Sequence, residues 1–421
     1  MANPTRRYRA ALLTPTDAGE LLFLPDAVLE VDPQGRIASI SDYQREPHAH
    51  GLLQDLRGHL IVPGFVDTHL HVPQTRVIGS AAGPLLEWLD STVFPEEARF
   101  ADTDYAAQVA HQFLDCCGSV GTTTFMAFAT SHPAATERTF EICVERGFRA
   151  TLGLTLMDQN CPPALRLASD VALQSSRELA QRFHGAADGL IRFAVTPRFA
   201  LSCSRPLLEG AAKLSEELQL PIQTHISENA REGVETLIEH PYAADYLGVY
   251  EAVGLLTSRT ILAHAIHLTA SEWERLAASG AAIAHCPDSN AFLGSGKFNL
   301  GKALAHGIRT GLGSDVAAGR SFDLRRASSH AFDTAREVGV DVSAAALFER
   351  ATLEGARALG LADKVGSLEP GKDADFVVLS TKVPQLDQHV AVRLAGFGAE
   401  LAPVARTYVR GRLVFDARSS F

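Results

Sequence analysis

The sequence predicts an α/β fold, a (β/α)8 TIM-type barrel with a small β-sandwich domain built from both chain termini. Three observations predict it. Between residues 60 and 315, eight short apolar runs alternate with helical patterns. Most of these runs lack the polar alternation of a half-solvated strand, as buried parallel strands do. The two ends of the chain carry β-like runs separated by turn residues.

The expected barrel strands are Leu60–Asp67, Thr122–Ala127, Arg149–Leu156, Ile191–Thr196, Pro221–His225, Thr260–His264, Ala281–His285 and Ile308–Gly313. The helical patterns between them include Asp104–Gly118, Pro133–Gly147, Arg205–Leu218 and Ala270–Gly280. Several of these patterns end in glycine, which accepts the left-handed backbone that commonly follows a helix.

The chain is expected to divide at two points. Residues 1–61 and 364–421 form the two parts of the small β domain, and residues 62–363 form the barrel. In the first flank, turn residues predict turns at Asp32–Gly35 and Gln54–Gly58. In the second flank, GSLEPGKDADFVVLS and RTYVRGRLVFD are again β-like with turn residues between them.

Composition excludes several classes of protein. The net charge is 38 − 49 = −11 and no block of Lys and Arg occurs, so a nucleic-acid polymer is not an expected partner. No apolar run reaches the ~18–20 residues that span a bilayer, so we expect no membrane partner and a cytoplasmic location. The six cysteines form no C-x-x-C and suit reduced thiols, and the lack of P-C-x-x-C excludes the zinc deaminases built on that signature.

Metal-ligating side chains follow the ends of four expected strands. His69 and His71 follow the first strand, His225 closes the fifth, His264 closes the sixth and Asp315 follows the eighth. Because the carboxyl ends of barrel strands open on one face, these side chains should converge. Histidine nitrogens with a carboxylate suit zinc or iron, with a position left for water. The sequence therefore predicts a metal site formed by His69, His71, His225 and Asp315.

One metal ion per subunit is expected. A second ion would usually need a bridging carboxylated lysine after the fourth strand, but that strand ends at Pro197 and the first lysine of the chain is Lys213. Zn2+ is the expected ion, and iron or manganese stays open.

Acid–base catalysis is expected from residues beside the metal. Glu228 lies three residues after His225 and is the candidate general acid and base. Asp315 can ligate the metal while it accepts a proton from water. His264 is either a direct ligand or a group that orients water and stabilises developing charge, and the sequence leaves both roles open.

These motifs resemble the amidohydrolase superfamily, specifically its hydrolytic nucleobase-deaminase branch. The resemblance rests on PGFVDTHLH, THISE, AHAIHL, AHCPDSN, GLGSD and GSLEPGKDADFVVL, and it covers nearly the whole chain. Four further segments, HVPQT, PLLEWLDSTVFPEEARF, VTPRFALSCS and THISEN, look like the guanine-deaminating members of that branch. The resemblance implies a zinc-dependent hydrolysis of guanine to xanthine and ammonia by a homodimer.

By the same resemblance, a small purine substrate would contact Gln74, Arg198, Phe199, His225, Glu228 and Asp315. An amide can donate to and accept from a ring edge, a guanidinium donates to a carbonyl such as guanine O6, and a phenyl ring stacks. Another amino-heterocycle (8-oxoguanine, a pterin, cytosine or a triazine) is the alternative substrate. A non-catalytic scaffold with the same fold is the alternative of another class.

Four residues near these motifs have other expected roles. Trp88 and Phe94 are expected to pack in the core and Cys286 to be structural. Whether His285 lines the pocket stays open.

Overall fold

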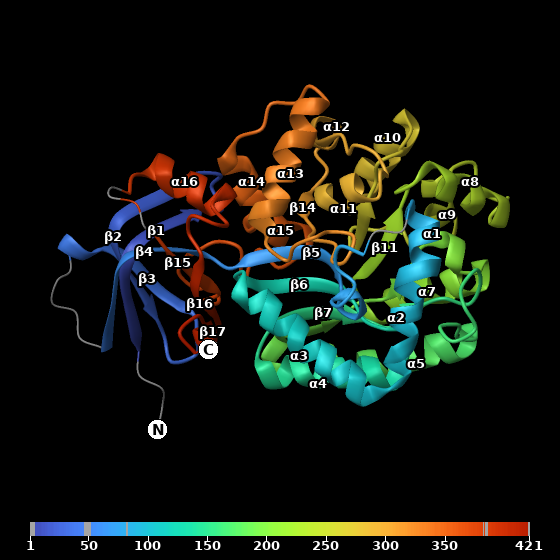
Figure 1. The fold of residues 1–421 in the computed structure, drawn as a ribbon, viewed down its shortest axis with the longest axis horizontal. Coiled ribbons are helices and arrows are strands. Elements are labelled where there is room, and N and C mark those ends of the chain that lie inside the picture. Colours follow the sequence, from blue (N-terminus) through green and yellow to red (C-terminus); the bar gives the residue numbers. More distant parts are fainter. Residues whose placement is uncertain (1–4, 46–51, 81–82, 382, 384–385, 420–421) are drawn as a thin grey trace.

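The computed structural model describes residues 5–45, 52–80, 83–381, 383 and 386–419 (Figure 1). A sheet formed by the first and last strands of the chain occupies one end of the molecule, and a larger α/β body forms the rest (Figure 1). Among the described residues, none of the helices has the length and apolar character needed to cross a membrane.

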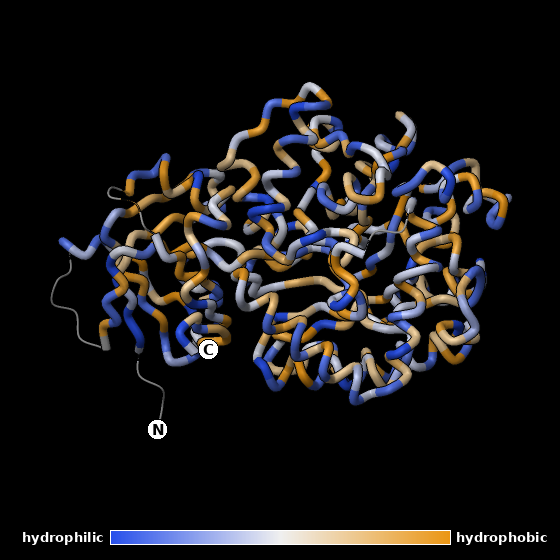
Figure 2. The backbone as a smooth tube through the Cα atoms, viewed as in Figure 1, coloured by the Kyte–Doolittle hydropathy of each residue, from blue (hydrophilic) through white to orange (hydrophobic). Residues whose placement is uncertain are grey.

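Eight parallel strands, one at each expected position, build the larger body. They lie in two four-stranded sheets with the orders β5-β6-β7-β9 and β11-β12-β13-β14. The strands are β5 (Phe65–His71), β6 (Thr122–Phe128), β7 (Arg149–Gly153), β9 (Ile191–Phe193), β11 (Ile222–Ile226), β12 (Thr260–His264), β13 (Ala282–His285) and β14 (Thr310–Leu312). Nearly every residue in them is buried, which explains why their sequences are continuous apolar runs. Figure 2 shows that hydrophobic and hydrophilic residues alternate along the helices that surround them.

Isolated contacts join the two sheets. On one side, Phe199 forms a parallel bridge with His225, and on the other side the Asp315 N–H donates to the His69 carbonyl oxygen at 2.9 Å. Within the described residues the two sheets are otherwise separate ladders. Both sheets therefore present the carboxyl ends of their strands to the same region.

Three of the expected strands are each split in two. The expected strand Leu60–Asp67 is divided between β4 (Leu52–Pro63), which belongs to the sheet of the chain ends, and β5. Beyond β7 and β9, the short strands β8 (Thr155–Leu156) and β10 (Thr196–Pro197) pair only with each other. The chain between β10 and β11 carries Arg198 and Phe199 toward the site.

Helices cover the strands. They are α3 (Thr103–Ser119), α4 (Pro133–Arg146), α5 (Ser169–Phe183), α6 (Ala186–Gly189), α7 (Arg205–Leu218), α8 (Ala230–Glu239), α9 (Tyr246–Ala252), α10 (Ala270–Ser279), α11 (Pro287–Phe292), α12 (Leu300–Ala305), α13 (Leu324–Glu337), α14 (Ala344–Arg350), α15 (Leu353–Ala358) and α16 (Gln388–Phe397). The four helices expected by range agree with α3, α4, α7 and α10 to within one residue at each end. Gly147 and Gly280 follow α4 and α10 with φ of 74° and 71°, as expected of terminating glycines.

Short helical segments connect β5 to α3. They are the 3-10 turn Val72–Gln74, α1 (Leu85–Trp88), the π-helical turn Leu89–Val93, α2 (Phe94–Ala98) and the 3-10 turn Arg99–Ala101. This connection contains the LLEWL and FPEE motifs. Two other 3-10 turns lie at Tyr43–Arg45 and Ala200–Ser202.

Strands from both ends of the chain form one seven-stranded sheet of order β17-β16-β15-β4-β1-β2-β3. They are β1 (Arg6–Pro15), β2 (Leu21–Val31), β3 (Ile37–Asp42), β4 (Leu52–Pro63), β15 (Phe376–Ser380), β16 (Val404–Val409) and β17 (Arg412–Asp416). Pairing of β15 with β4 joins the two chain ends. Packed rings of Tyr8, Phe376 and Tyr408, with centroids 4.4–5.4 Å apart, form part of the core of this sheet.

One expected turn in this sheet is present and the other is wrong. A turn spans Asp32–Gly35, where the Gly35 N–H donates to the Asp32 carbonyl oxygen at 3.0 Å. Residues Gln54–Gly58 instead lie within β4. There the pairing with β1 shifts register, and Gly58 has a φ of 85°, so these residues form a bulge in a continuous strand.

A buried ion-pair cluster ties the terminal sheet to the larger body. Arg149, the first residue of β7, donates to Asp373 at 2.7 Å and to Asp375 at 3.0 Å. All three side chains are buried. Each charge therefore depends on its partners, because an unpaired charge at this depth is costly.

Candidate active site

The end of β5 places two histidines in the interior. The rings of His69 and His71 are perpendicular, with centroids 5.0 Å apart. Asp67 holds this strand end, since its Oδ1 accepts the N–H of His69 at 3.2 Å and the N–H of Ser314 at 3.0 Å. Burial raises the pKa of Asp67 to about 7. The bond to Ser314 fixes the end of β5 beside the segment that carries Asp315.

The ends of β11 and β12 supply two more histidines. His225 donates from Nδ1 to the carbonyl oxygen of Arg198 at 2.5 Å, and His264 donates from Nδ1 to Oδ1 of Asn290 at 2.8 Å. A ring that carries its proton on Nδ1 in this way has Nε2 turned toward the other site residues. Such a second hydrogen bond commonly orients metal-ligating histidines.

Asp315 lies among these rings. Its Oδ1 is 3.3 Å from Nε2 of both His69 and His71, and its Oδ2 is 3.7 Å from Nε2 of His264. Burial acts to raise the pKa of Asp315, but the close approach of the His69 ring, with help from His71 and His264, holds that pKa well below its usual range. Asp315 is therefore a carboxylate at neutral pH.

The backbone at two of these positions is strained. His264 has a φ of 70° and Asp315 a φ of 49°, in the left-handed region that residues with a Cβ disfavour by roughly 1–2 kcal/mol. This backbone conformation directs both side chains toward the site. Such conformations often occur at functional sites.

The donor atoms fit a divalent metal ion. His71 Nε2 lies 3.3 Å from His225 Nε2, and the buried Nε2 of His69 has no hydrogen-bond partner among the described residues. Burial lowers the pKa of His71 to about 4 and holds that of His225 well below its ordinary value, so both rings are neutral, the form that ligates metals. Two neutral ring nitrogens at this separation, beside an orphaned third and a carboxylate, form a donor set that suits a divalent metal ion.

Cys286 also approaches this cluster, since its Sγ lies within 4.8 Å of ligand atoms of His69, His264 and Asp315. Burial raises the pKa of its thiol well above the ordinary value, so it is a protonated thiol and a poor ligand. This agrees with the structural role expected for it.

Glu228 follows β11 and points at the same centre. Its Oε2 lies 3.4 Å from His264 Nε2, and its Oε1 accepts a hydrogen bond from Ser295 at 3.2 Å. Burial, reinforced by the negative charge of Asp315, raises the pKa of Glu228 to about 8. The two buried carboxyl groups therefore differ in protonation at pH 7: Glu228 holds a proton and Asp315 does not.

The loop that carries Glu228 is held by a residue that the sequence analysis missed. Glu232, in the first turn of α8, accepts the N–H of Glu228 at 3.0 Å and of Asn229 at 3.1 Å through Oε2, and accepts from Tyr246 at 2.5 Å through Oε1. Burial raises the pKa of Glu232 to about 7. The Asn229-x-x-Glu232 pattern is a capping box and was the signal that could have found it.

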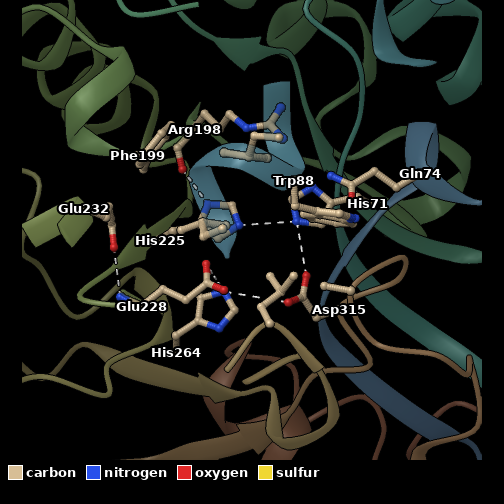
Figure 3. A pocket seen from close by; sticks show the side chains of 14 residues that line it. His71, Gln74, Trp88, Arg198, Phe199, His225, Glu228, Glu232, His264 and Asp315 are labelled. Carbon is tan, nitrogen blue, oxygen red and sulfur yellow. Dashed lines mark hydrogen bonds and ion pairs between the residues drawn. The ribbon is translucent and has the colours of Figure 1, made fainter. Parts of the chain in front are cut away.

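A cavity opens onto these residues (Figure 3). Its lining consists of His71, Gln74, Leu85, Trp88, Leu89, Arg198, Phe199, His225, Glu228, Glu232, His264, Leu293, Asp315 and Ala318. Every residue predicted as a catalytic or substrate-binding group is in this set. His69 lies behind the others, in contact with His71 and Asp315.

Residues of the connection between β5 and α3 form part of the cavity wall. Trp88, expected to be a core residue, is buried and donates to the carbonyl oxygen of Ser80 at 2.8 Å, yet it also lines the cavity. Phe94 packs as expected, with its ring centroid 5.2 Å from Cζ of Arg198. His285 is not part of the lining, because its ring lies against Phe298 with centroids 4.6 Å apart.

A second missed residue contacts two of the predicted substrate-binding side chains. Glu97 in α2 accepts hydrogen bonds from Gln74 at 3.2 Å and from Arg198 at 2.5 Å. It is 23 residues from Gln74 and 101 from Arg198 along the chain, so no local pattern links the three.

Comparison with known proteins gives concordant matches. A profile described as the Amidohydrolase family matches residues 60–414. The guanine deaminase of Escherichia coli (strain K12) is 36% identical over 413 residues, covering 95% of this chain and 93% of that protein. Human guanine deaminase is 33% identical over 389 residues, covering 90% of this chain and 84% of that protein.

Solved structures agree. The structure of E. coli guanine deaminase matches with a TM-score of 0.94 at 34% identity, covering 98% of this chain and 100% of that one. The structure of guanine deaminase from C. acetobutylicum with guanine bound in its active site matches with a TM-score of 0.90 at 30% identity, covering 98% and 100%.

Proposed function

This chain belongs to the amidohydrolase family, and from that premise we propose that it is a guanine deaminase, which hydrolyses guanine to xanthine and ammonia. The family expected from the sequence motifs is thereby confirmed. Relatives that share about a third of their residues over nearly the full length carry this activity in their names, and one solved relative holds guanine in its active site.

One observation carries the proposal: two buried carboxyl groups of opposite protonation converge on one cavity beside the neutral rings of His71 and His225. Burial raises the pKa of Glu228 to about 8, whereas His69, despite the opposing effect of burial, holds the pKa of Asp315 well below its usual range. Pairs of titratable groups whose pKa values are pushed apart mark the acid and base of a reaction.

His69, His71, His225 and Asp315 would hold Zn2+, one per chain, which when bound lowers the pKa of a coordinated water toward ~7. The fit rests on the orphaned Nε2 of His69 and on the facing nitrogens of His71 and His225. Iron and manganese suit the same donors and are distinguished by elemental analysis.

The acid–base roles follow from protonation states. Asp315, ionised, accepts a proton from the water that attacks C2 of the ring. Glu228, protonated, donates to the ring nitrogen beside C2 and makes that carbon more electrophilic. His264 lies within 3.4 Å of Glu228 and 3.7 Å of Asp315, where it orients the water and stabilises the charge that develops. The hydroxyl group on the tetrahedral carbon then gives its proton to the Glu228 carboxylate as the C2 carbonyl forms, and Asp315 returns its proton to the amino group, which leaves as ammonia.

The substrate contacts lie on the other wall of the cavity. Gln74 and Arg198 offer N–H groups to acceptors of the purine, and Phe199 offers an apolar face. Phe199 is fixed beside the metal cluster by its backbone bridge to His225. The ring would thus lie between donors on one side and Glu228 on the other.

The finer architecture is also a proposal. We propose that the eight strands close as a (β/α)8 barrel over residues 62–363, because contacts join both pairs of sheet edges. The seven-stranded sheet supports a small β-sandwich domain formed by residues 1–61 and 364–421. The homodimer rests on the family resemblance, and sedimentation tests it. The cytoplasmic location rests on the lack of a long apolar run in the sequence.

The function is tested with purified protein loaded with zinc. Guanine consumption, xanthine formation and ammonia release are followed together, and 8-oxoguanine, a pterin, cytosine and a chlorinated triazine are assayed in parallel. Rapid equimolar xanthine and ammonia from guanine supports the proposal. A preference for another ring would overturn guanine as the substrate but keep hydrolytic deamination as the reaction. Failure with every ring, with metal bound, would favour the scaffold.

A further inference from the structure

A buried carboxylate lies directly behind the substrate-facing wall of the cavity. Glu97, in α2, is 3% exposed and is not part of the cavity lining. Its Oε1 accepts a hydrogen bond from Nε2 of Gln74 at 3.2 Å, and its Oε2 accepts one from Nη1 of Arg198 at 2.5 Å. Gln74 and Arg198 do line the cavity, so one carboxylate joins the two side chains that a ligand meets.

These contacts fix which way the amide of Gln74 faces. A carboxylate only accepts, so the atom of Gln74 that faces Glu97 must be the NH2 group. The oxygen of the same amide group supports this orientation, because Oε1 of Gln74 accepts the N–H of Ala317 at 3.2 Å. One N–H of the amide is then left over. Gln74 therefore presents a donor to a ligand, whereas the sequence alone allowed it to donate or to accept.

Arg198 is held in the same way. Within the part of the chain that the structure describes, Glu97 is the only hydrogen-bond partner of its guanidinium. Phe94, three residues before Glu97 on α2, places its ring 5.2 Å from Cζ of Arg198 and restricts the guanidinium from a second direction. The remaining N–H groups are free to donate, and the carboxylate balances the buried positive charge.

We propose that Glu97 is a positioning residue that sets substrate specificity by fixing Gln74 and Arg198 as hydrogen-bond donors, so that the cavity selects purines with a 6-oxo group. This inference rests on the proposed function and identifies the 6-oxo group as the feature of the purine ring that the site recognises. Guanine presents acceptors at O6 and N7, whereas adenine presents a 6-amino donor beside N7. A wall that only donates leaves the 6-amino group without a partner.

Hypoxanthine and purine provide a matched pair of probes, because they differ by the 6-oxo group and the N1 proton that accompanies it. Neither carries the 2-amino group, so both serve as competitive inhibitors of guanine turnover. Their inhibition constants are measured for the parent enzyme, for Glu97→Gln and for the matched control Glu96→Gln. Glu96 is also buried on α2, but it bonds Tyr105 and Arg99 and neither Gln74 nor Arg198.

The parent should bind hypoxanthine more tightly than purine, and Glu97→Gln should reduce that preference by roughly 10- to 100-fold, the usual effect of losing hydrogen bonds to a charged group. The loss should come from weaker binding of hypoxanthine, with purine little changed. Glu96→Gln should keep the parental preference. An unchanged preference in folded Glu97→Gln, or an equal loss for both probes, would overturn the proposal.

Glu97→Asp is the second test variant, used if Glu97→Gln does not fold. It keeps the charge that balances Arg198 but withdraws the carboxylate by one methylene, so the preference should again fall. Guanine turnover by the parent separates the two claims. If the parent does not deaminate guanine, the proposed function fails, whereas an active parent with a preference insensitive to Glu97 contradicts this inference alone.

Discussion

Replacing Glu228 with glutamine removes the proton that the account places next to the substrate ring while keeping the shape of the side chain. Ser295 can still donate to the carbonyl oxygen of the new amide, as it now donates to Oε1 at 3.2 Å. The three metal-site histidines and Asp315 are untouched. The variant should therefore bind metal as the parent does and lose turnover.

The expected loss is roughly 10³-fold in kcat, about 4 kcal/mol of barrier, within the 10²–10⁴ range for a general acid–base group. The two other carboxyl groups of the cavity lining, Glu232 and Asp315, cannot substitute. Glu232 lines the same cavity, but both its oxygens are engaged by backbone N–H groups and by Tyr246. Asp315 is ionised and cannot supply the proton.

The pH profile gives an independent check on the same residue. Because burial raises the pKa of Glu228 to about 8, its protonated form is present below that pH and is lost above it. Parental kcat/KM should fall as pH rises through about 8, and the residual activity of Glu228→Gln should lack that fall.

Glu235→Gln is the matched control, since Glu235 lies on the outer face of α8 and pairs with Arg231 at 2.7 Å. It should keep parental turnover. Steady-state kinetics on guanine, with metal content measured on the same samples, compares the parent with both variants. Normal turnover in Glu228→Gln, or a loss explained by missing metal, would refute the reasoning.

Three further predictions concern stability. Arg149→Met leaves Asp375 buried without its cation and Asp373 with Arg410 alone, so denaturant unfolding should show a loss of roughly 3–5 kcal/mol, and a loss below 1 would contradict the importance of this ion-pair cluster. Chelation of the metal should lower the melting temperature and zinc should restore it, whereas His71→Ala should abolish the recovery; equal recovery in that variant would remove His71 from the site. In metal-free protein, the pKa of Glu228, raised from 4.5 to about 8, gives stability that is present below pH 4.5 and lost as pH rises to about 8. Glu228→Gln should thus be more stable than the parent at pH 9, by roughly 3–5 kcal/mol, and an equal stability would show that Glu228 is not desolvated.

The strands of the larger body were predictable because they are buried on both faces. Thr260–His264 is an uninterrupted run with no polar alternation until its last residue, and the structure has β12 at those residues. The predicted turn at Gln54–Gly58 was wrong because Asp and Gly are favourable both in turns and in β-bulges. Only the long-range pairing with β1 distinguishes a turn from a bulge here, and the local sequence does not predict that pairing.

The convergence of the metal-site residues could be predicted because it follows from the topology alone. Parallel strands bring their carboxyl ends together, so His225 and Asp315 needed only to be placed at strand ends. His285 also ends a strand, yet its ring faces Phe298, because the direction of a side chain depends on packing that a strand boundary does not encode. Glu97 was missed for a related reason: its partners come from β5 and β10 loops far along the chain, and only the fold brings them to α2.

The central claim is that water attacks C2 of guanine and displaces ammonia, and turnover of guanine in water labelled with oxygen-18 tests it most directly. Mass spectrometry of the xanthine, with ammonia measured in the same reaction, gives the result. The account predicts one labelled oxygen in each xanthine and one ammonia released with it, and both should be lost together in Glu228→Gln. Xanthine without the label, or consumption of guanine without ammonia, would contradict hydrolytic deamination at this site.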